Sequence, residues 1–581
     1  MVMEKIPALA LLGAALPYLV TCSILLIIYL SSHPRPLPGI AYNKEASKSM
    51  LGDMPTLWRA KYRRTWVQEH PRSHGVAISQ VFLNPFSWAK HNSTVLLTDH
   101  REVLDILSRR TKEFDRSQLN ERVVGMVAPN FHYTMMSSDP RFKLQRELLK
   151  DVMTPVFLSN VAAPRAHDRA QHILALWELK LQKGQGRPFA ADHDLFLGML
   201  DIISSVAFGM EGMSPALQQE AAFLETINPN LPASAAEPVS FDRTTMSREV
   251  EALLDIPEML AIGQGSPFPK TTQILAALFR PKHARAFWHQ RSLMVDQTNK
   301  ALRKVTDGGE DTRSSALDYL VLREMKIAER LGRKPNSYSP AIRDELLGFL
   351  LAGHHTNATT LAWWTKYMSR FPLVQCRLRA ELRAAHPAAV KAGRLPSAVE
   401  IQSTVIPYLD AVLEESMRYA GVITIVTRTA TCDTEVLGSR IPKGTDIMLF
   451  LTGPSYTEPA VSIPEHLRSA SSREHKNTVP EWGDDVALFK PERWLRKTVD
   501  EVTGQEMDVF EARAGPSLPF AAGPRQCFGK KLAYLQLRTV MTLLTWTFEF
   551  GELDKGLNTD DVFEAFVNNP KDCYVKLSRC K

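Results

Sequence analysis

Cys527 lies in a short segment that could present a cysteine sulfur to a metal ion. The segment reads FAAGPRQCFG, and Gly523 and Gly529 would let the backbone approach a planar cofactor closely. Arg525, the loop amides and the start of the following helix could hold the sulfur as a thiolate, because positive charge and N–H groups favour the deprotonated form. A lone cysteine is more often an ordinary buried side chain. The residues around Cys527 favour the ligand, and we predict a thiolate–metal bond here.

A carboxylate and a guanidinium are spaced to pair in YLDAVLEESMRYAG. Glu415 and Arg418 share one face of the predicted helix 405–420 and can form a hydrogen-bonded ion pair. Most such pairs are solvated and carry no further meaning. The segment FKPERW follows at 489–494, ahead of the cysteine segment.

A long helix should carry polar groups near its middle. Ser339 and Pro340 predict its start, because serine caps a helix N-terminus and proline suits the first turn, and it should end before Pro372. The segment AGHHTNATT and the turn before it present at helical spacing Phe349, Gly353, Thr356 and Thr360. Gly353 would leave room for a ligand beside the backbone. An isolated threonine in such a helix is more often packed in the core.

A mainly helical framework must position these side chains. Apolar periodicity predicts helices at 141–158, 163–182, 215–226, 272–305, 339–370, 373–385 and 405–420. Strand-like segments lie at 74–83, 93–97, 423–430, 433–437 and 446–451, and residues 454–520 are rich in loop-forming types. No repeat or long linker divides the chain. The predicted fold class is mainly α with a minor β-sheet subdomain, in one domain at 45–581.

Composition excludes several classes of protein. The 581 residues are 44% hydrophobic, which allows a large buried core. The net charge of +7 is spread along the chain without a dense basic run, and this argues against nucleic-acid binding. The six cysteines contain no C-x-x-C pair, so a disulfide scaffold or zinc cluster is not expected and a reducing compartment is favoured.

The N-terminus is predicted to be a membrane anchor. Ile6 to Leu30 carries no charged residue and would span about 37 Å as a helix, enough for a bilayer core. No small-residue cleavage site follows, and residues 33–44 form a stiff, Pro-rich connector. Basic residues after the span place its C-terminal side in the cytosol. We therefore expect a single transmembrane helix within residues 1–32.

The order of these segments resembles the cytochrome P450 superfamily, in its fungal microsomal type. The family's segment Phe-x-x-Gly-x-Arg-x-Cys-x-Gly is matched here by Phe520, Gly523, Arg525, Cys527 and Gly529. The resemblance covers about residues 45–581. It implies the cytochrome P450 fold and a haem b whose iron is bound by the Cys527 thiolate. It also implies that Glu415, Arg418 and Arg493 form a buried ionic cluster that supports the cofactor pocket.

The chain departs from the family's pattern around the predicted proton relay. Thr356 matches the family's alcohol, which helps to deliver protons to bound oxygen. The family usually has Asp or Glu before this threonine and a second threonine after it, where this chain has His355 and Asn357. Because histidine can relay protons near neutral pH, we expect His355 to take the acid's place, with core packing as the alternative.

Two arginines are candidate partners for the haem propionates. The family commonly has Trp-x-x-x-Arg on the helix that crosses the proximal side of the haem, and this chain has Phe142 and Arg146, so the indole donor is lost. Arg146 and Arg428 could each bind a propionate, or either could be a surface arginine. An acidic electron donor could dock on the basic side chains around the thiolate, those of Arg141, Lys143, Arg146, Lys150, Lys530 and Lys531.

The resemblance implies a monooxygenase. Family members take electrons from NADPH through a flavoprotein reductase, with cytochrome b5 as a second candidate donor, and insert one atom of O2 into an apolar substrate. The implied setting is the endoplasmic reticulum membrane, with a cytosolic catalytic domain and a lipophilic substrate of fungal secondary metabolism. Candidate substrate contacts are 112–135, 222–262, 345–356, 421–426 and 563–569. Two alternatives stay open: a haem-thiolate isomerase, dehydratase or peroxygenase that needs no reductase, and a non-catalytic haem sensor.

Overall fold

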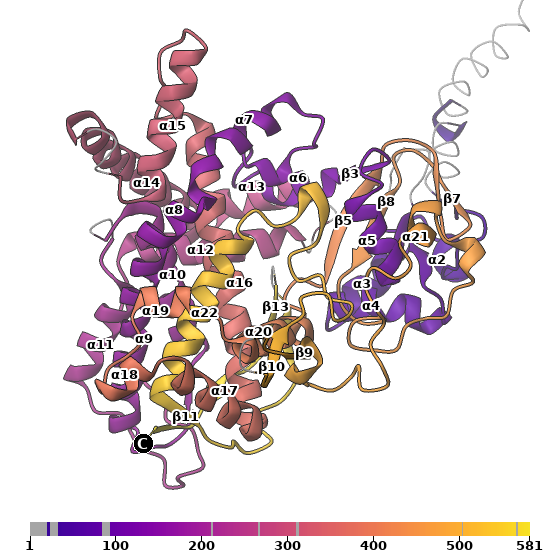
Figure 1. Ribbon diagram of the computed structural model, residues 1–581. Coiled ribbons are helices and arrows are strands. Elements are labelled where there is room, and N and C mark those ends of the chain that lie inside the picture. Colours follow the sequence, from indigo (N-terminus) through magenta and orange to yellow (C-terminus); the bar gives the residue numbers. More distant parts are fainter. Residues whose placement is uncertain are drawn as a thin grey trace, which may run out of the picture.

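The helices form one broad body, and a small sheet with short N-terminal helices lies at its side (Figure 1). The computed structural model describes residues 20–23, 33–83, 93–210, 213–264, 266, 268–308, 313–501, 504–564 and 567–580. The predicted fold class, mainly α with a minor β-sheet, is confirmed.

Four long helices make the centre of the helical body: α9 (Ala163–Lys183), α10 (Asp192–Phe208), α16 (Pro340–Arg370) and α22 (Lys530–Thr547). Helix α10 packs along α16, and α22 packs against α9 and α16. A Cβ atom on Gly353 of α16 would come within 2.6 Å of the Ile203 Cδ1 atom of α10. Gly353 therefore lets two helices approach closely, and it also lines the internal cavity described below, in agreement with its predicted place beside a ligand.

Helix α16 begins and ends where the sequence predicts. The Ser339 side chain accepts a hydrogen bond from the Ile342 amide, and Pro340 occupies the first turn. Pro372 then opens the next helix, α17 (Pro372–Ala385). The start and the end of α16 are thus set by local chemistry, and its middle is free to carry the functional side chains.

The larger sheet has five strands in the order β1-β2-β8-β5-β3. These are β1 (Ile78–Val81), β2 (Thr94–Leu97), β8 (Asp446–Phe450), β5 (Ile425–Ala430) and β3 (Phe114–Arg116). Strands β2 and β8 are parallel, and the other neighbours are antiparallel. The register pairs Arg116 of β3 with Arg428 of β5. Two arginines that are far apart in the sequence therefore sit side by side.

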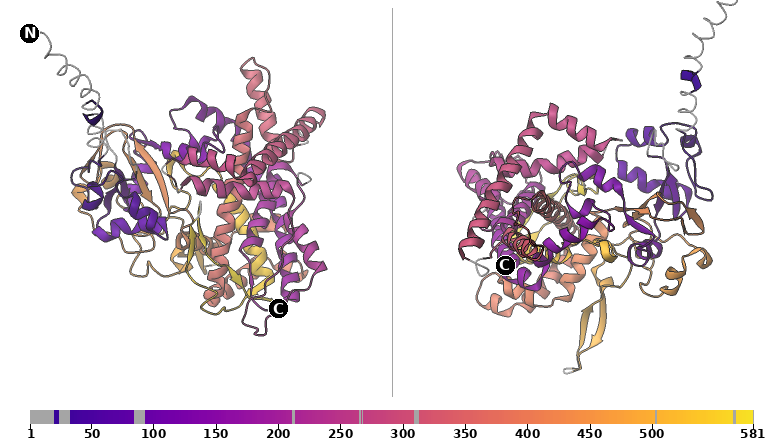
Figure 2. Two further views of the ribbon diagram at one scale, coloured as in Figure 1. Left: turned by 180° about the vertical axis from the view of Figure 1, so that it is seen from behind. Right: turned by 90° about the horizontal axis from the view of Figure 1, so that it is seen from above.

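The outer helices and small strands complete the body. The helices are α2 (Lys44–Ser47), α3 (Met54–Arg59), α4 (Arg63–His74), α5 (His100–Ser108), α6 (Gln118–Val124), α11 (Ala216–Thr226), α12 (Arg248–Gln264), α15 (Ala316–Arg330), α18 (Pro387–Lys391), α19 (Ala398–Ser403), α20 (Pro407–Ala420) and α21 (Ala470–Glu474). Short strand pairs are β4 (Phe189–Ala190) with β14 (Tyr574–Val575), β6 (Thr434–Val436) with β7 (Ser439–Ile441), β11 (Phe548–Phe550) with β15 (Leu577–Arg579), and β12 (Val562–Glu564) with β13 (Asn568–Pro570). The hairpin β9 (Leu495–Val499) and β10 (Glu506–Phe510) projects from the body (Figure 2).

Two predicted helices are interrupted by proline. The prediction 141–158 covers α7 (Pro140–Leu148) and the short α8 (Pro155–Phe157), and Pro155 begins the second piece. The prediction 272–305 covers α13 (Pro269–Phe279) and α14 (Pro281–Gly308), which meet at Pro281. Proline lacks the amide that would continue a helix and disfavours helical geometry in the residue before it. The first residues of the predicted strand 74–83 are likewise not extended, because His74 ends α4.

The predicted connector 33–44 is docked on the sheet. Gln80 of β1 accepts a hydrogen bond from the Leu37 amide and donates to the carbonyls of Leu37 and Ile40. Leu37 and Ile40 are buried. This stretch therefore packs as part of the main body, and only α2 at its end is helical.

The predicted membrane anchor lies outside the described residues, apart from Val20 to Ser23. Within the described part of the chain, no helix is both long and apolar enough to cross a membrane. The transmembrane helix and the division at residues 32 and 44 stay predictions.

Candidate active site

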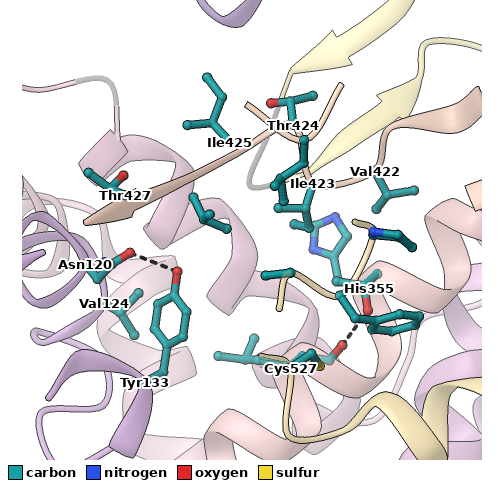
Figure 3. Close-up of a pocket in the computed structure, with 18 of the residues that line it drawn as sticks. Asn120, Val124, Tyr133, His355, Val422, Ile423, Thr424, Ile425, Thr427 and Cys527 are labelled. Carbon is teal, nitrogen blue, oxygen red and sulfur yellow. Dashed lines mark hydrogen bonds between the residues drawn. The ribbon is translucent and has the colours of Figure 1, made fainter. Parts of the chain in front are cut away.

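A tight loop holds Cys527 just before α22. The Cys527 amide donates to the Phe520 carbonyl at 2.9 Å, and the Gln526 amide donates to the Gly523 carbonyl at 3.0 Å. The side chain of Cys527 opens onto an internal cavity (Figure 3). The loop therefore presents the sulfur to that cavity from a rigid mount.

Burial by the surrounding protein raises the pKa of the Cys527 thiol, and the amides of Gly529 and Lys530 and the charge of Lys530 oppose this. Arg525 does not contribute. Its guanidinium donates to the Met135 carbonyl at 2.8 Å and to Ser137 Oγ at 3.1 Å. The prediction that Arg525 holds the sulfur deprotonated was wrong, because its side chain points to the segment before α7. A bound metal ion would stabilise the thiolate form of Cys527, which the loop alone does not do.

Gly523 is required by its backbone conformation and by a close contact. Its φ is +72°, and an added Cβ would overlap the Leu107 carbonyl oxygen and lie 2.9 Å from the Ser108 Cα atom of α5. The glycine therefore packs the loop against α5, which differs from the cofactor contact that we predicted.

An alanine in the left-handed conformation costs about 1–2 kcal/mol. Gly523→Ala should lower the free energy of unfolding by more than this, because the clash with the α5 backbone adds to that strain. Gly444→Ala is the matched control, since Gly444 has φ +88° with nothing within 4 Å of an added Cβ. Chemical unfolding of both variants measures the difference. Equal losses of stability would contradict the contact.

A cavity of about 710 Å³ extends from Cys527 over α16. In Figure 3, Asn120, Val124 and Tyr133 lie along one side and the residues from Val422 to Thr427 along another. The predicted substrate segments 112–135, 345–356 and 421–426 all contribute. Segment 222–262 contributes through Pro257, Leu260 and Ala261, and the described residues of 563–569 do not line it.

All four members of the predicted α16 face line this cavity: Phe349, Gly353, Thr356 and Thr360. Thr356 Oγ1 donates to the Ala352 carbonyl at 2.7 Å, and Thr360 Oγ1 donates to the Thr356 carbonyl at 2.9 Å. Each hydroxyl thus has a local partner along the helix. Thr356 can exchange that partner for a water or a ligand without moving the backbone.

His355 is buried beside Thr356. Its ring lies 4.9 Å from the Phe196 ring and close to Asn569. Burial and the nearby charges of His354 and Arg64 lower the pKa of His355 to about 3. The imidazole is therefore neutral near pH 7. The sequence had led us to expect a histidine that titrates near neutral pH. The next residue, Asn357, donates to Gln536 Oε1 at 2.6 Å and ties α16 to α22.

The low pKa of His355 gives a testable pH dependence of stability. The folded protein keeps this ring neutral, whereas the unfolded chain protonates it below pH 6.5. The stabilising contribution of His355 to the free energy of unfolding is therefore complete above pH 6.5, and it is lost as the pH falls towards 3. Relative to His355→Asn, the wild type should lose about 1.4 kcal/mol more between pH 7.5 and 5.5. Unfolding by urea at both pH values measures it. Parallel losses in the two proteins would show that His355 is not a buried neutral ring.

Glu415, Arg418 and Arg493 come together as one buried cluster. Arg418 makes a two-point contact with Glu415, with both nitrogen–oxygen distances at 2.8 Å. Arg493 Nε donates to Glu415 Oε1 at 3.2 Å, and Trp494 Nε1 donates to Oε2 at 3.0 Å. The cluster fixes α20 against the segment 485–494.

Arginines gather beside the cysteine loop without a carboxylate partner. Arg116, Arg428 and Arg525 form no ion pair in the part of the chain that the structure describes. The Asp115 carboxylate, which lies in the same strand as Arg116, accepts from Ser137 and forms no ion pair with these arginines among the described residues. Burial and mutual repulsion lower the pKa of Arg428 and of Arg525 to about 9. A buried excess of positive charge fits an anionic ligand, as the two carboxylates of a haem would be.

Sequence reasoning missed Arg116, and it left Arg146 and Arg428 as equal candidates. Arg116 is buried, and its Nε has no partner among the described residues. Arg146 stacks on the Phe528 ring at 4.4 Å, and neither Arg146 nor Arg428 lines the cavity, whereas Arg116 does. The register of β3 and β5, which the sequence does not reveal, brings Arg116 beside Arg428.

The loop, the cavity and the arginines define the site of a haem-thiolate protein, and comparison with known proteins agrees. The family model "Cytochrome P450" matches residues 68–460 and 481–577, so this chain belongs to the cytochrome P450 family. It is 33% identical to the cytochrome P450 monooxygenase GME11363 of Pestalotiopsis microspora, over 95% of this chain and 96% of the relative. It is 32% identical to the monooxygenase TRI13 of Fusarium sporotrichioides, over 97% and 99%. Family membership makes the chain a monooxygenase with a cysteine-ligated haem.

Proposed function

We propose that this enzyme oxidises a lipophilic small molecule with O2 and with electrons from NADPH that arrive through a flavoprotein reductase. The observation that carries the proposal is the cavity of about 710 Å³ that joins Cys527 to Thr356. Its walls are largely apolar, and the haem and a hydrophobic substrate would share this cavity. We place the reaction in fungal secondary metabolism. The similar proteins are fungal monooxygenases, and they include xilC of Penicillium crustosum, 31% identical over 94% of this chain and 92% of that protein.

The residues present would hold a haem b. Cys527 would bind its iron, and Arg116, Arg428 and Arg525 would neutralise its propionates. When bound, the haem would supply the electron transfer and the activation of O2. The apolar walls would keep water from the reacting substrate.

Proton delivery would fall to neutral groups. Thr356 Oγ1 lies on the cavity wall and can turn from the Ala352 carbonyl towards a water molecule. His355 would act as a neutral imidazole that accepts a proton on one nitrogen as it releases one from the other. No carboxylate immediately precedes Thr356 in the sequence, so we assign proton delivery to Thr356, His355 and water.

An acidic reductase would dock on the face that covers the cysteine loop. Lys143 and Lys150 of the α7 region and Lys530 and Lys531 at the start of α22 are exposed. Arg141 is also exposed but pairs with Asp139. Such a face would steer an acidic electron donor, with cytochrome b5 as the second candidate. We further propose that the N-terminal anchor holds the enzyme in the endoplasmic reticulum membrane with its catalytic domain in the cytosol.

The proposed reaction can be tested with a purified reductase. We expect conversion of a member of a terpenoid, polyketide and alkaloid panel only with NADPH and reductase present, and one atom of isotopically heavy O2 in the product. Conversion without NADPH, or without the heavy atom, would instead assign an isomerase, dehydratase or peroxygenase. Spectral binding of haem ligands with no conversion of any compound would favour the haem sensor.

A further inference from the structure

His132 and Glu345 form a buried pair beside the cysteine loop. The Glu345 carboxylate accepts the His132 backbone amide at 2.7 Å, and its second oxygen lies 2.7 Å from the imidazole Nδ1. Glu345 is fully buried in α16, and the His132 side chain is 13% exposed. Burial raises the pKa of the Glu345 carboxyl, and its contacts with His132 oppose this rise. With the carboxylate ionised, it only accepts hydrogen bonds, and Nδ1 of His132 donates to it. One carboxylate thus fixes both the backbone and the ring of His132.

His132 contacts the cysteine loop on both sides of Cys527. Arg525 donates to the His132 carbonyl at 3.3 Å, and the His132 ring lies 5.8 Å from the Phe528 ring. His132 and Glu345 also line the cavity onto which Cys527 opens. His132 is therefore held at the point where α16, the loop and the cavity meet.

The second ring nitrogen is available to a ligand. Nδ1 of His132 is taken by Glu345, and no hydrogen bond of Nε2 is found among the described residues. Arg116 and Arg525 line the same cavity. An imidazolium carries a hydrogen on each ring nitrogen, so it can donate to Glu345 through Nδ1 and to a second acceptor through Nε2.

Phe142 supplies the reason why a donor is needed here. Its ring is 6.4 Å from the His132 ring, and a phenyl group has no N–H to donate. Where the family commonly carries Trp, this chain carries Phe142. The imidazole of His132 reaches the same neighbourhood from a different segment.

We propose that His132, oriented by Glu345, donates a hydrogen bond through Nε2 to a haem propionate and replaces the indole donor that Phe142 lacks. The inference rests on the haem of the proposed function. His132 is a positioning residue: it would retain and orient the cofactor, and by adding positive charge near a propionate it would favour the reduced haem.

The test uses the purified full-length holoenzyme and two readouts other than turnover. In His132→Ala, haem should transfer to excess apomyoglobin about tenfold faster or more, because loss of a supporting partner weakens cofactor binding by that order. The haem reduction potential should become more negative, because a donor to a propionate is lost. Glu345→Gln should shift both readouts in the same direction by less. Adding Phe142→Trp to His132→Ala should restore both readouts towards the wild type.

His386→Gln is the matched control, because His386 is a buried histidine that does not line the cavity. It should leave both readouts unchanged. Wild-type values in His132→Ala would overturn the proposal. Altered values that Phe142→Trp does not restore would also overturn it, since His132 would then be a packing residue only. If His132→Ala does not fold, the same two readouts are measured in His132→Gln with and without Phe142→Trp, and the same outcomes support or overturn the proposal. Failure of the wild type to bind haem would refute the proposed function. A wild type that binds haem normally, together with wild-type readouts in His132→Ala, would refute this inference alone.

Discussion

Arg418→Ala should leave almost no soluble, haem-loaded protein. The Arg418 guanidinium is 1% exposed and binds Glu415, which is 0% exposed, and it also donates to the carbonyls of Val486 and Leu488. Removing one member of a buried ion pair costs about 3–5 kcal/mol, because the other charge stays buried with fewer partners. That is a large part of the about 5–15 kcal/mol that holds a folded protein together. Soluble yield and haem content per chain measure the effect.

Arg440→Ala is the control for this prediction. Arg440 pairs with Asp433 at 2.8 Å, but both side chains are largely exposed. Exposed pairs contribute little, so yield and haem content should match the wild type. An Arg418→Ala protein with wild-type yield and haem content would contradict the structural role of the cluster.

Cys527→Ala should abolish NADPH-dependent oxidation, down to the rate without enzyme. Among the described residues, Cys527 is the only cysteine that lines the cavity, so no neighbouring sulfur can replace it. The loop is held by backbone hydrogen bonds, and the variant should therefore still fold. Product formation in the reductase assay measures the loss.

Cys376→Ala, which removes an exposed cysteine of α17, should keep full activity. Residual oxidation by Cys527→Ala above the background would mean that another group binds the iron.

The helices that the sequence predicts well have both a start signal and one apolar face. Helix α16 has Ser339 and Pro340 at its start, and α20 combines a proline start with Gly421 in a left-handed conformation at its end. Helix α10 was missed because it is buried nearly all round, so its sequence DHDLFLGMLDIISSVAF shows no polar face. Helices α12 and α15 escaped prediction as well, and Pro257 inside α12 weakens the helical signal.

Some features of the site are predictable from local sequence, and others depend on contacts between distant segments. Cys527 and the Glu415–Arg418 pair follow from spacing within one segment, and the structure brings each group together as expected. Arg116 depends on strand register across the sheet, and His132 depends on a contact with α16 across a sequence separation of 213 residues. Neither contact leaves a local pattern.

The direction of single side chains was the least predictable feature. Arg525 lies close to Cys527 in sequence but points to Ser137. His355 was expected to titrate near neutral pH, but the packing of α10 against α16 buries it. Burial depends on the whole fold, and residue type and spacing do not report it.

The most direct test of a haem-thiolate site at Cys527 is the difference spectrum of the reduced protein with carbon monoxide, recorded for the wild type and for Cys527→Ala. The wild type should show the strongly red-shifted Soret band of a thiolate ligand, and Cys527→Ala should lack it. A folded, haem-loaded wild type with only an imidazole-type band would contradict the assignment of Cys527 as the ligand.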